Sequence, residues 1–494
     1  MTPAGNADEH ACPQVWSGLH FLAIAAFSLR LVVAWCSVRI TYPDELFQYL
    51  EQAHRLVFGY GIVPWEFRFA ARNWLLPGTL AVLLEGLRAI GLDKPTVYIP
   101  VIKSVFALLS VCLVYATYSI GRNMFGERTG RVAAAIAAIW YELLYVSTVA
   151  TPEVLSAYAI VCALALVMGR ASTRRATLIG LLLGVSVALR LQYAVPGVAL
   201  FVLVVINWQR RYALLAAAAS AVVFGFAGLL DAWSWGTPFI SYYNNIDFNL
   251  LIGKAGGFGR SPFLQYLYWL TFASLGLHVF AIGYGALHWR RCWPILVLVT
   301  CVLLPHSLMP HKEYRFVFLA VPLVLVLLAD AIVNGSQRLR TIFGEPTVLR
   351  TAIATIAAVS VAGCVFRGVF ARDDRLLATL DLSRRSNVAA VLDLTGCWSS
   401  SGGFYYLHRD VPLYFRRQFN DVPPSDMRSL VSHALLPAVH AGIPGFRVST
   451  RYRTVTIWEQ EAPPLAYRRL KKDAREPRQA GVDDSFGPGP WPCE

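Results

Sequence analysis

Charged residues are scarce in this sequence. They make up 15% of the 494 residues, and the mean hydropathy is +0.50. A typical soluble domain carries about 25% charged residues. Apolar runs long enough to cross a bilayer recur from Leu19 to Gly363. The shortage of charge therefore excludes a soluble globular protein and predicts a polytopic α-helical membrane protein.

The sequence also lacks cysteine patterns that bind metals or form disulfide frameworks. No two cysteines are spaced as Cys-x-x-Cys, and no cysteine and histidine stand at a zinc-ligand spacing. Thiols inside apolar runs behave as small hydrophobic side chains. Five of the nine cysteines lie in such runs: Cys36, Cys112, Cys162, Cys301 and Cys364. We therefore expect neither a disulfide framework nor a zinc site.

No lysine or arginine precedes the first apolar run, so residues 1–17 do not have the composition of a cleaved signal peptide. We expect Leu19–Val38 to be retained as a helix. By length, about eleven runs can span a bilayer, although the pair between Ala176 and Trp208 could be a single re-entrant element. The expected spans are 18–39, 97–120, 131–150, 153–169, 176–190, 193–208, 212–231, 263–287, 293–309, 316–333 and 350–366.

The net charge of +14 arises from basic residues in short loops between apolar runs, and no basic stripe of the kind that binds nucleic acid is present. Alternation of the spans places five arginine-rich loops on one face, which the positive-inside rule makes cytoplasmic. These loops are GRNMFGERTGR, RASTRR, NWQRRY, HWRRC and NGSQRLR. The opposite, outer loops hold Asp44, Glu45, Glu51, Glu66, Glu153, Asp231 and Glu313. We therefore expect the polar chemistry on the lumenal or periplasmic side.

The composition changes near residue 367, which divides the chain into three predicted regions. Residues 1–366 form the transmembrane domain. Residues 367–466 carry mixed charge and turn residues and read as a small α/β domain on the outer side. Residues 467–494 are basic and then rich in glycine and proline, so we expect disorder there.

The first outer loop, 40–75, begins with a pattern typical of a helix start. Pro43 is followed by Asp44 and Glu45, which favour a helix N-terminus. An apolar stripe and a polar stripe alternate from there, which predicts an amphipathic helix at the membrane surface. The polar stripe contains Asp44, Gln48, Glu51 and Arg55. An ordinary interfacial helix with a capping acid is the alternative.

A second cluster of ionisable residues, His311, Lys312, Glu313 and Arg315, lies between two expected spans. Such groups at a membrane boundary are costly unless they are paired or used, and cations suit a phosphate. Charged ends that snorkel to the interface are the alternative. The loop lies on the outer face, however, so orientation does not explain its cations.

Two further features interrupt apolar runs. Arg190 either pairs with a buried carboxylate or binds a ligand. Asp231, with Trp233 and Trp235, ends an expected span on the outer side, where the tryptophans could simply belong to an interfacial aromatic belt.

The HKEYRF sequence at 311–316 resembles the HKExRF motif of glycosyltransferase family 22, the polyprenyl-phosphate-mannose-dependent mannosyltransferases of the GT-C class. Residues 43–67, PDELFQYLEQAHRLVFGYGIVPWEF, resemble the first outer loop of that family. They are most similar to the subgroup that adds the third mannose of the glycosylphosphatidylinositol (GPI) core. Residues 72–74, Arg-Asn-Trp, depart from the common Arg-Ser-Tyr of the family. The resemblance covers about residues 20–325.

This resemblance implies a GT-C architecture and an inverting transfer of mannose from a polyprenyl- or dolichyl-phosphate donor, with no metal or other cofactor. GT-C enzymes usually carry an essential acid in the first outer loop, which Asp44 matches, with Glu45 as its neighbour. The resemblance implies donor-phosphate contacts from four residues: His311, Lys312, Arg315 and Arg72. We expect seven further residues to contact substrate: Gln48, Glu51, Trp65, Glu66, Glu313, Arg190 and Asp231.

We expect the acceptor to be a lipid-linked or GPI-like glycan and the new bond to be an α-1,2 linkage. A GT-C transferase of another sugar and a polytopic lipid or solute transporter are the alternatives. Only 6 of the 44 basic residues are lysine, a composition typical of GC-rich genomes. It favours a bacterial inner membrane with a periplasmic site over an endoplasmic-reticulum membrane.

Overall fold

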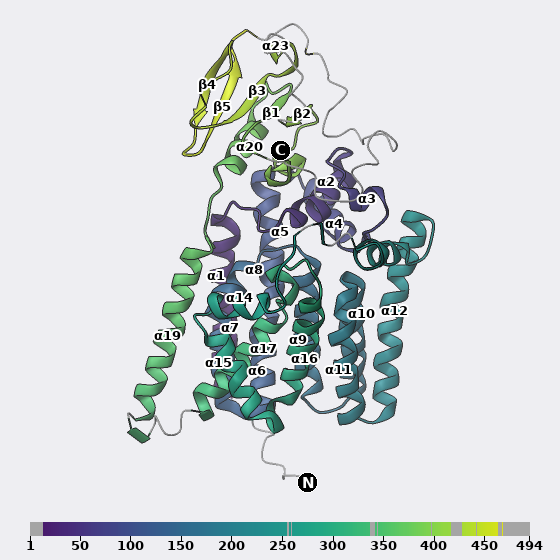
Figure 1. The fold of residues 1–494 in the computed structure, drawn as a ribbon, viewed down its shortest axis with the longest axis vertical. Coiled ribbons are helices and arrows are strands. Elements are labelled where there is room, and N and C mark those ends of the chain that lie inside the picture. Colours follow the sequence, from purple (N-terminus) through teal and green to yellow (C-terminus); the bar gives the residue numbers. More distant parts are fainter. Residues whose placement is uncertain are drawn as a thin grey trace. The chain divides into compact units, whose positions relative to one another are not determined.

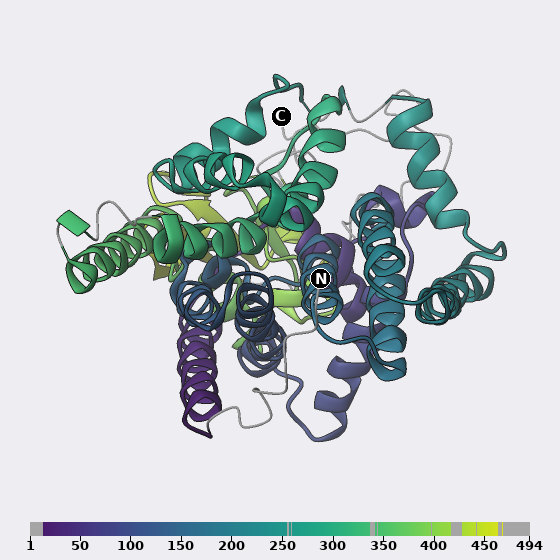
Figure 2. The same ribbon diagram turned by 90° about the horizontal axis from the view of Figure 1, so that it is seen from below.

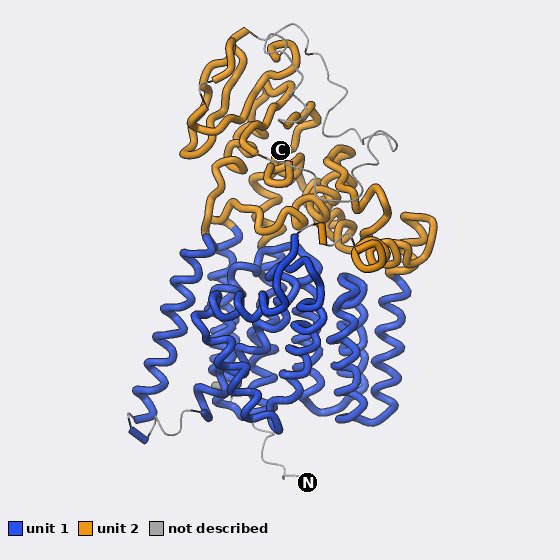
Figure 3. Tube along the Cα trace, in the orientation of Figure 1, with its two compact units in different colours: residues 1–34, 104–226, 259–369 blue, residues 35–103, 227–258, 370–494 orange. Residues whose placement is uncertain are grey.

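The computed structural model describes residues 13–253, 256–257, 259–335, 341–342, 344–396, 398–415, 427–440, 442–462 and 467, with side chains from residue 18 onward. The chain packs into two compact units, each assembled from three segments (Figure 3). Unit 1 comprises residues 1–34, 104–226 and 259–369, and unit 2 comprises residues 35–103, 227–258 and 370–494. Of the tail for which we expect disorder, 467–494, residues 468–494 lie outside the described residues.

Unit 1 is helical, and most of its helices run side by side, so that Figure 2 shows them nearly end-on (Figures 1 and 2). The elements that fall mainly in this unit are α1 (Pro13–Cys36), α6 (Cys112–Phe125), α7 (Glu127–Ile139), α8 (Tyr141–Val146), α9 (Pro152–Val167), α10 (Thr173–Leu189), η2 (Leu191–Tyr193), α11 (Ala194–Asn207), α12 (Arg210–Trp235), α14 (Gln265–Ala273), α15 (Leu277–Leu287), α16 (Trp289–Leu308), η5 (Tyr314–Val317), α17 (Ala320–Asp330), η6 (Ala331–Gly335) and α19 (Glu345–Phe366).

Helix α17 lies at the centre of unit 1, and every residue of it is buried. Helices α6 and α7 pack at very close range because glycines face each other. A Cβ atom added at Gly130 would lie 2.8 Å from the carbonyl oxygen of Tyr118, and one at Gly121 would lie 3.0 Å from Cα of Gly130. Small residues that let helix backbones approach are typical of helix pairs in membranes.

Among the described residues, five helices are long and apolar enough to cross a bilayer. They are Gly18–Cys36, Pro95–Phe125, Arg210–Trp235, Trp289–Leu308 and Glu345–Phe366. A sixth candidate is the bent pair α14 and α15, and three more apolar helices are shorter. The expected number of about eleven spans therefore stays a prediction.

Two expected spans are interrupted for identifiable reasons. The 131–150 run breaks at Trp140, whose extended backbone (φ −62°, ψ 123°) separates α7 from α8. The 263–287 run bends by 112° between α14 and α15, where Leu275 and Gly276 both have positive φ. Hydropathy alone registers neither break, since both runs remain apolar in sequence.

Unit 2 combines residues 35–103, which include the expected first outer loop, with residues 227–258 and the C-terminal segment. Its helical elements are η1 (Glu45–Leu50), α2 (Glu51–Phe58), α3 (Trp65–Arg68), α4 (Leu75–Ala89), α5 (Pro95–Ser110), α13 (Ile240–Ile246), η3 (Asp247–Leu251), α20 (Asp374–Arg384), η7 (Trp398–Ser400), α21 (Gly403–Leu407) and α23 (Met427–Leu430). Its strands are β1 (Val391–Asp393), β2 (Leu413–Phe415), β3 (His433–Pro437), β4 (Phe446–Arg451) and β5 (Val455–Gln460).

The five strands form one mixed sheet in the order β2-β1-β3-β5-β4. Strands β2, β1 and β3 are parallel, whereas β5 runs antiparallel to both β3 and β4. Apolar residues such as Leu392, Tyr414 and Leu436 form its buried core. These strands and helices lie where the sequence predicts a small α/β domain, at 367–466. They pack in the same unit as residues 35–103.

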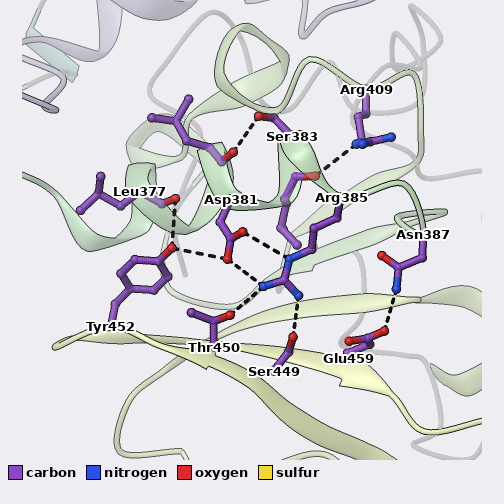
Figure 4. A network of polar contacts seen from close by, with 12 residues as sticks. Leu377, Asp381, Ser383, Arg385, Asn387, Arg409, Ser449, Thr450, Tyr452 and Glu459 are labelled. Atoms are coloured by element: carbon purple, nitrogen blue, oxygen red, sulfur yellow. Dashed lines mark hydrogen bonds and ion pairs between the residues drawn. The ribbon is translucent and has the colours of Figure 1, made fainter. Parts of the chain in front are cut away.

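A polar network attaches α20 to strand β4 (Figure 4). Arg385, directly after α20, donates to Asp381 at 2.7 Å, to Ser449 Oγ at 2.6 Å and to Thr450 Oγ1 at 2.7 Å. Asn387 donates to Glu459 of β5 at 2.6 Å. The network fixes the helix on the sheet through groups that remain partly exposed.

The close contact between α6 and α7 yields a stability prediction. Gly130→Ala forces the two backbones apart, so we expect it to lower the free energy of unfolding by about 1–3 kcal/mol. Gly225→Ala is the matched control, because Gly225 also lies inside a helix but nothing lies within 4 Å of an added Cβ. Thermal unfolding in detergent checks both. Equal melting temperatures for the two variants would contradict the packing.

Candidate active site

The candidate catalytic acids lie at the start of a continuous helix, 43–58, in unit 2. A π-helical turn, η1, follows Asp44 and widens the first part of this helix. Such turns recur at functional sites. Glu45 is buried, whereas Asp44 is partly exposed. Of the two carboxylates, Asp44 is therefore the one that a substrate can approach.

The middle of the polar stripe of this helix is buried. The sequence predicts a surface helix with this stripe toward water, but Gln48 and Glu51 are buried, while Asp44 and Arg55 are partly exposed. Partners from later in the chain account for the difference, because they supply hydrogen bonds to the stripe inside the unit. A sequence pattern cannot distinguish a polar face that meets water from one that meets protein.

Gln48 joins two other residues that were expected to contact substrate. Its amide nitrogen donates to Glu66 Oε1 at 2.6 Å, and its amide oxygen accepts from Nε of Arg72 at 2.9 Å. Gln48 and Glu66 are both buried. The opposite orientation of the amide would place its NH₂ group against Arg72, so this network fixes Gln48 and holds the Arg72 guanidinium in place.

Asp231 fixes the turn that carries Arg72. Its carboxylate accepts from Asn73 Nδ2 at 2.6 Å and from the backbone N and Oγ of Ser241 at 3.0 and 2.6 Å. Trp235 Nε1 donates to the carbonyl oxygen of Arg72 at 3.1 Å. The departure from Arg-Ser-Tyr at 72–74 thus has a structural role, because the amide of Asn73 reaches Asp231.

Trp65 is the remaining expected substrate residue of this loop. Its ring lies 4.3 Å from that of Phe248 in η3. Trp233 is 84% exposed, as the interfacial-belt alternative requires, whereas Trp235 is half-buried and takes part in the Arg72 turn. The two tryptophans therefore differ in role.

Glu51 is fully buried and accepts three backbone hydrogen bonds. Oε1 accepts from the N–H groups of Ile62 at 2.8 Å and Phe404 at 3.1 Å, and Oε2 accepts from Tyr405 at 2.7 Å. Burial raises the pKa of Glu51 to about 7, and the three backbone donors and Arg55 oppose that rise. Both oxygens are thus occupied by the protein itself.

The HKEYRF loop lies in unit 1 and is organised by Glu313. Oε1 of Glu313 lies 3.1 Å from His311 Nε2, and Oε2 lies 2.8 Å from Arg315 Nε. Burial by itself would raise the pKa of Glu313, but the hydrogen bonds and charges of His311 and Arg315 lower it to about 2. Glu313 therefore orients two of the expected phosphate ligands.

Lys312 has different surroundings. It is buried, and its ammonium donates to the carbonyl oxygens of Ser261, at 3.3 Å, and of Met309. Within the described part of the chain, no carboxylate lies within ion-pair distance of it. A buried cation compensated only by carbonyl dipoles favours an anionic ligand.

Arg190 lies beside the same motif. Its guanidinium lies 5.5 Å from the ring centroid of Phe316, and that of Arg315 lies 5.4 Å from the same ring. Arg190 also pairs with the buried Glu153 at 3.2 Å. The carboxylate pairing that was one of the two alternatives for Arg190 is therefore present, and it holds the cation beside the motif.

Sequence analysis missed Glu142. This carboxylate in α8 is buried and accepts from Trp140 Nε1 at 2.7 Å and from the hydroxyl of Tyr314, the variable position of HKEYRF. His278 Nε2 lies 3.2 Å from it. The available signal was an acidic residue inside an apolar run, at the break between α7 and α8.

The structure thus groups the expected site residues in two sets. Unit 2 holds Asp44, Glu45, Gln48, Glu51, Trp65, Glu66, Arg72 and Asp231, and unit 1 holds Arg190, His311, Lys312, Glu313 and Arg315. Among the described residues, no group of three histidine, cysteine, aspartate or glutamate side chains could hold a metal ion.

Residues 21–379 match the Alg9-like mannosyltransferase family, which is more than half of the chain. The chain belongs to this family. Among relatives, the GPI mannosyltransferase 3 of Yarrowia lipolytica is 26% identical over 412 residues, covering 80% of this chain and 76% of the relative. The GPI alpha-1,2-mannosyltransferase 3 of Bos taurus is 24% identical over 413 residues, covering 82% and 74%.

Solved structures show the same fold at low sequence identity. ArnT from Cupriavidus metallidurans bound to undecaprenyl phosphate has a TM-score of 0.61 at 12% identity and covers 92% of this chain and 100% of its own. The oligosaccharyltransferase AglB from Archaeoglobus fulgidus has a TM-score of 0.54 at 14% identity, covering 87% and 70%. This Alg9-like mannosyltransferase is therefore a multi-pass membrane α-mannosyltransferase with a helical GT-C fold. The family, the enzyme class and the membrane mannosyltransferase function expected from the sequence are confirmed.

The raised pKa of Glu51 predicts that the stability of the protein depends on pH. Its pKa in the folded protein, about 7, exceeds its usual value of 4.5, so the stability that it contributes is complete below pH 4.5 and is lost as the pH rises through 7. Glu51→Gln cannot ionise, so up to roughly 3 kcal/mol of pH-dependent stability should disappear in that variant. Thermal unfolding between pH 4.5 and 8 measures this, with the exposed Glu85→Gln as control. Identical pH slopes for the wild type and Glu51→Gln would refute it.

The hydrogen bond from the Tyr314 hydroxyl to Glu142 predicts a role for that hydroxyl. Tyr314→Phe removes a donor from a buried carboxylate, so we expect a loss of about 1–3 kcal/mol of stability together with slower transfer. Tyr268→Phe, at a side chain that is 55% exposed, should change stability by less than about 0.5 kcal/mol. Melting temperatures and transfer rates of both variants provide the comparison. A silent Tyr314→Phe would show that Glu142 does not support the motif.

Proposed function

We propose that this mannosyltransferase moves mannose from a polyprenyl- or dolichyl-phosphate donor to a hydroxyl of a lipid-linked or GPI-like acceptor. The transfer inverts the anomeric centre and forms an α-1,2 linkage. The observation that carries the proposal is Lys312, a buried cation of the HKEYRF loop whose ammonium donates to the carbonyls of Ser261 and Met309, with no carboxylate at ion-pair distance among the residues that the structure describes. The names of the relatives support the linkage and the acceptor class.

The donor class has separate support. The neighbouring fold of ArnT is described as bound to undecaprenyl phosphate, and that of AglB as in complex with a dolichol-phosphate. A lipid phosphate offers no nucleotide diphosphate for a metal to bridge. We therefore propose that cations of the chain replace the metal and that the reaction needs no cofactor.

In the proposed reaction, the acceptor oxygen attacks the anomeric carbon from the face opposite the phosphate. As this bond forms, the bond between the anomeric carbon and the phosphate oxygen breaks, and the lipid phosphate leaves with the bonding electrons. Asp44 takes the hydroxyl proton. Lys312, Arg315 and His311 stabilise the departing phosphate, with Arg72 as a fourth contact. Glu45 is the substitute base.

The other expected residues divide by their surroundings. Trp65 is the proposed sugar-stacking side chain, and Gln48 and Glu66 are proposed to contact the substrate through the network that also holds Arg72. We propose that Arg190 and Glu313 act at the donor phosphate by placing cations around Phe316. Asp231 is proposed to act by setting the Arg72 turn.

The architecture completes the proposal. We propose about eleven spans, with the site and a small α/β domain at 367–466 on the outer face, where this domain would shape access of the acceptor. The arginine-rich loops support this orientation. The low lysine content favours a bacterial inner membrane with a periplasmic site, and the endoplasmic reticulum is the equivalent compartment in a eukaryote.

Transfer by the purified protein in detergent tests the function. We expect label to move from radiolabelled polyprenyl-phosphate mannose, and not from nucleotide-diphosphate mannose, to a panel of lipid-linked acceptors with or without chelator. Asp44→Asn should lower the rate by roughly two to four orders of magnitude. Glu85→Gln, an exposed carboxylate in α4, is the matched control.

The outcomes separate the alternatives. Near-normal turnover in Asp44→Asn with a dead Glu45→Gln would move the base to Glu45. Transfer of a different lipid-linked sugar would contradict mannose as the donor sugar. Loss of transfer on chelation would contradict the absence of a metal.

A further inference from the structure

We infer that Glu51 is a positioning residue that connects the helix carrying Asp44 to residues 401–408, a segment near the end of the chain. This inference rests on the proposed function, since it assumes that Asp44 is the base. It gives the 401–408 segment a part in the transfer reaction, and it replaces the expected substrate contact of Glu51.

The carboxylate of Glu51 fits this role because all three of its donors are backbone N–H groups of the chain. One belongs to Ile62 in the same outer loop, and two belong to Phe404 and Tyr405 in α21. Glu51 is fully buried, so no oxygen is left for a substrate hydroxyl. Both oxygens are needed to accept all three of these hydrogen bonds.

Glycine at 403 makes the approach of the two segments possible. Its φ is +54°, and a Cβ atom there would lie 2.8 Å from Glu51 Oε2 and 3.1 Å from the Phe47 ring. Any other residue would meet both the strain of positive φ and this contact. The 401–408 segment is therefore matched to the 43–58 helix at a specific point.

Contacts on both sides of Glu51 reinforce the connection. The ring of Phe47, one turn earlier, lies 4.7 Å from that of Trp398. One turn later, His54 Nε2 lies 3.0 Å from His408 Nδ1. The Tyr98 hydroxyl of α5 donates to the carbonyl of Tyr405. The segment and the preceding Trp398 contact the helix along two turns, not at a single atom.

Asp44 depends on this arrangement through the helix itself. Asp44, Gln48 and Glu51 lie on one continuous helix, so anchoring Glu51 limits the rotation of this helix about its axis and with it the position of Asp44. Gln48, between them, meets Glu66 and Arg72. A displacement of a catalytic group by about 1 Å can slow a reaction roughly 100-fold.

The experiment compares kcat and the KM for the lipid-phosphate donor. We expect Glu51→Ala to lower kcat by about 100-fold with a donor KM within about twofold of wild type, because the HKEYRF residues that contact the donor phosphate are untouched. Glu51→Gln keeps one oxygen for Ile62 and Phe404 but turns an NH₂ group toward the N–H of Tyr405. It should therefore lose less, about 10-fold.

The opposite side of the contact gives a second, independent variant. Gly403→Ala should lower kcat, and adding Glu51→Ala to it should lower kcat little further, since both changes break the same contact. Gly91→Ala is the matched control, because Gly91 has a φ of +75° but nothing within 4 Å of an added Cβ. It imposes the backbone strain without the clash and should leave kcat unchanged.

Hydrogen exchange of the full-length protein in detergent tests the connection without relying on activity. Peptides covering 45–62 and 401–408 should exchange faster in Glu51→Ala and Gly403→Ala, and at wild-type rates in Glu85→Gln and Gly91→Ala. Faster exchange with unchanged kcat would show that Glu51 only stabilises the local structure, and it would overturn the inference. A raised KM at normal kcat would instead assign Glu51 to the donor. A wild type that transfers no sugar would defeat the proposed function, while unchanged exchange in both variants would defeat the connection itself.

Discussion

Buried carboxylates determine how the functional loops of this protein are held. A charged or polar group that leaves water must find fixed partners, and at a membrane boundary these partners come from the chain. Glu51, Asp231 and Glu142 are buried and Glu313 is partly buried, and all four have such partners. Glu51 and Asp231 fix the 43–58 helix and the Arg72 turn, whereas Glu142 and Glu313 both hold the HKEYRF loop.

The four carboxylates differ in the kind of hydrogen-bond donor that surrounds them. Glu51 and Asp231 are satisfied largely by backbone and neutral donors, so they hold the 43–58 helix and the Arg72 turn without taking up cations. Glu313 does engage cations, and it orients Arg315 and His311. Asp44 is left as the partly exposed acid at the start of its helix. The same helix therefore carries a buried acid that holds the structure and a partly exposed acid that the proposed function makes the base.

The sequence was enough to predict the membrane character, the family and the two loops that carry the candidate chemistry. Short motifs such as HKEYRF keep their residues within one turn, so their local grouping follows from adjacency. The partners of Glu51 could not be found in this way, since Phe404 and Tyr405 lie some 350 residues away and offer only backbone donors. Any residue has such a donor, so no side-chain pattern marks it.

Breaks in apolar runs were equally hidden. The run 131–150 has the composition of one span, but the helix breaks at Trp140. Glu142, just after this break, accepts hydrogen bonds from Trp140 and Tyr314 and lies beside His278. Hydropathy averages over such a position, and a single acid changes the average little. The inward direction of the Gln48 and Glu51 stripe was hidden for a related reason, because water and buried donors satisfy the same polar pattern.

The charge of the HKEYRF loop suits both the bound donor and the departing lipid phosphate of the proposed transfer. With Glu313 ionised, Lys312 and Arg315 give the loop one net positive charge, apart from His311. The donor phosphodiester carries one negative charge, whereas a lipid phosphate monoester carries about −1.5 to −2 near neutral pH. Charge therefore builds up on the phosphate as the sugar leaves. The electrostatic attraction of Lys312 and Arg315 to the phosphate grows with this charge. Stabilisation that grows with the departing charge favours the transition state over the bound donor, which is the requirement for catalysis.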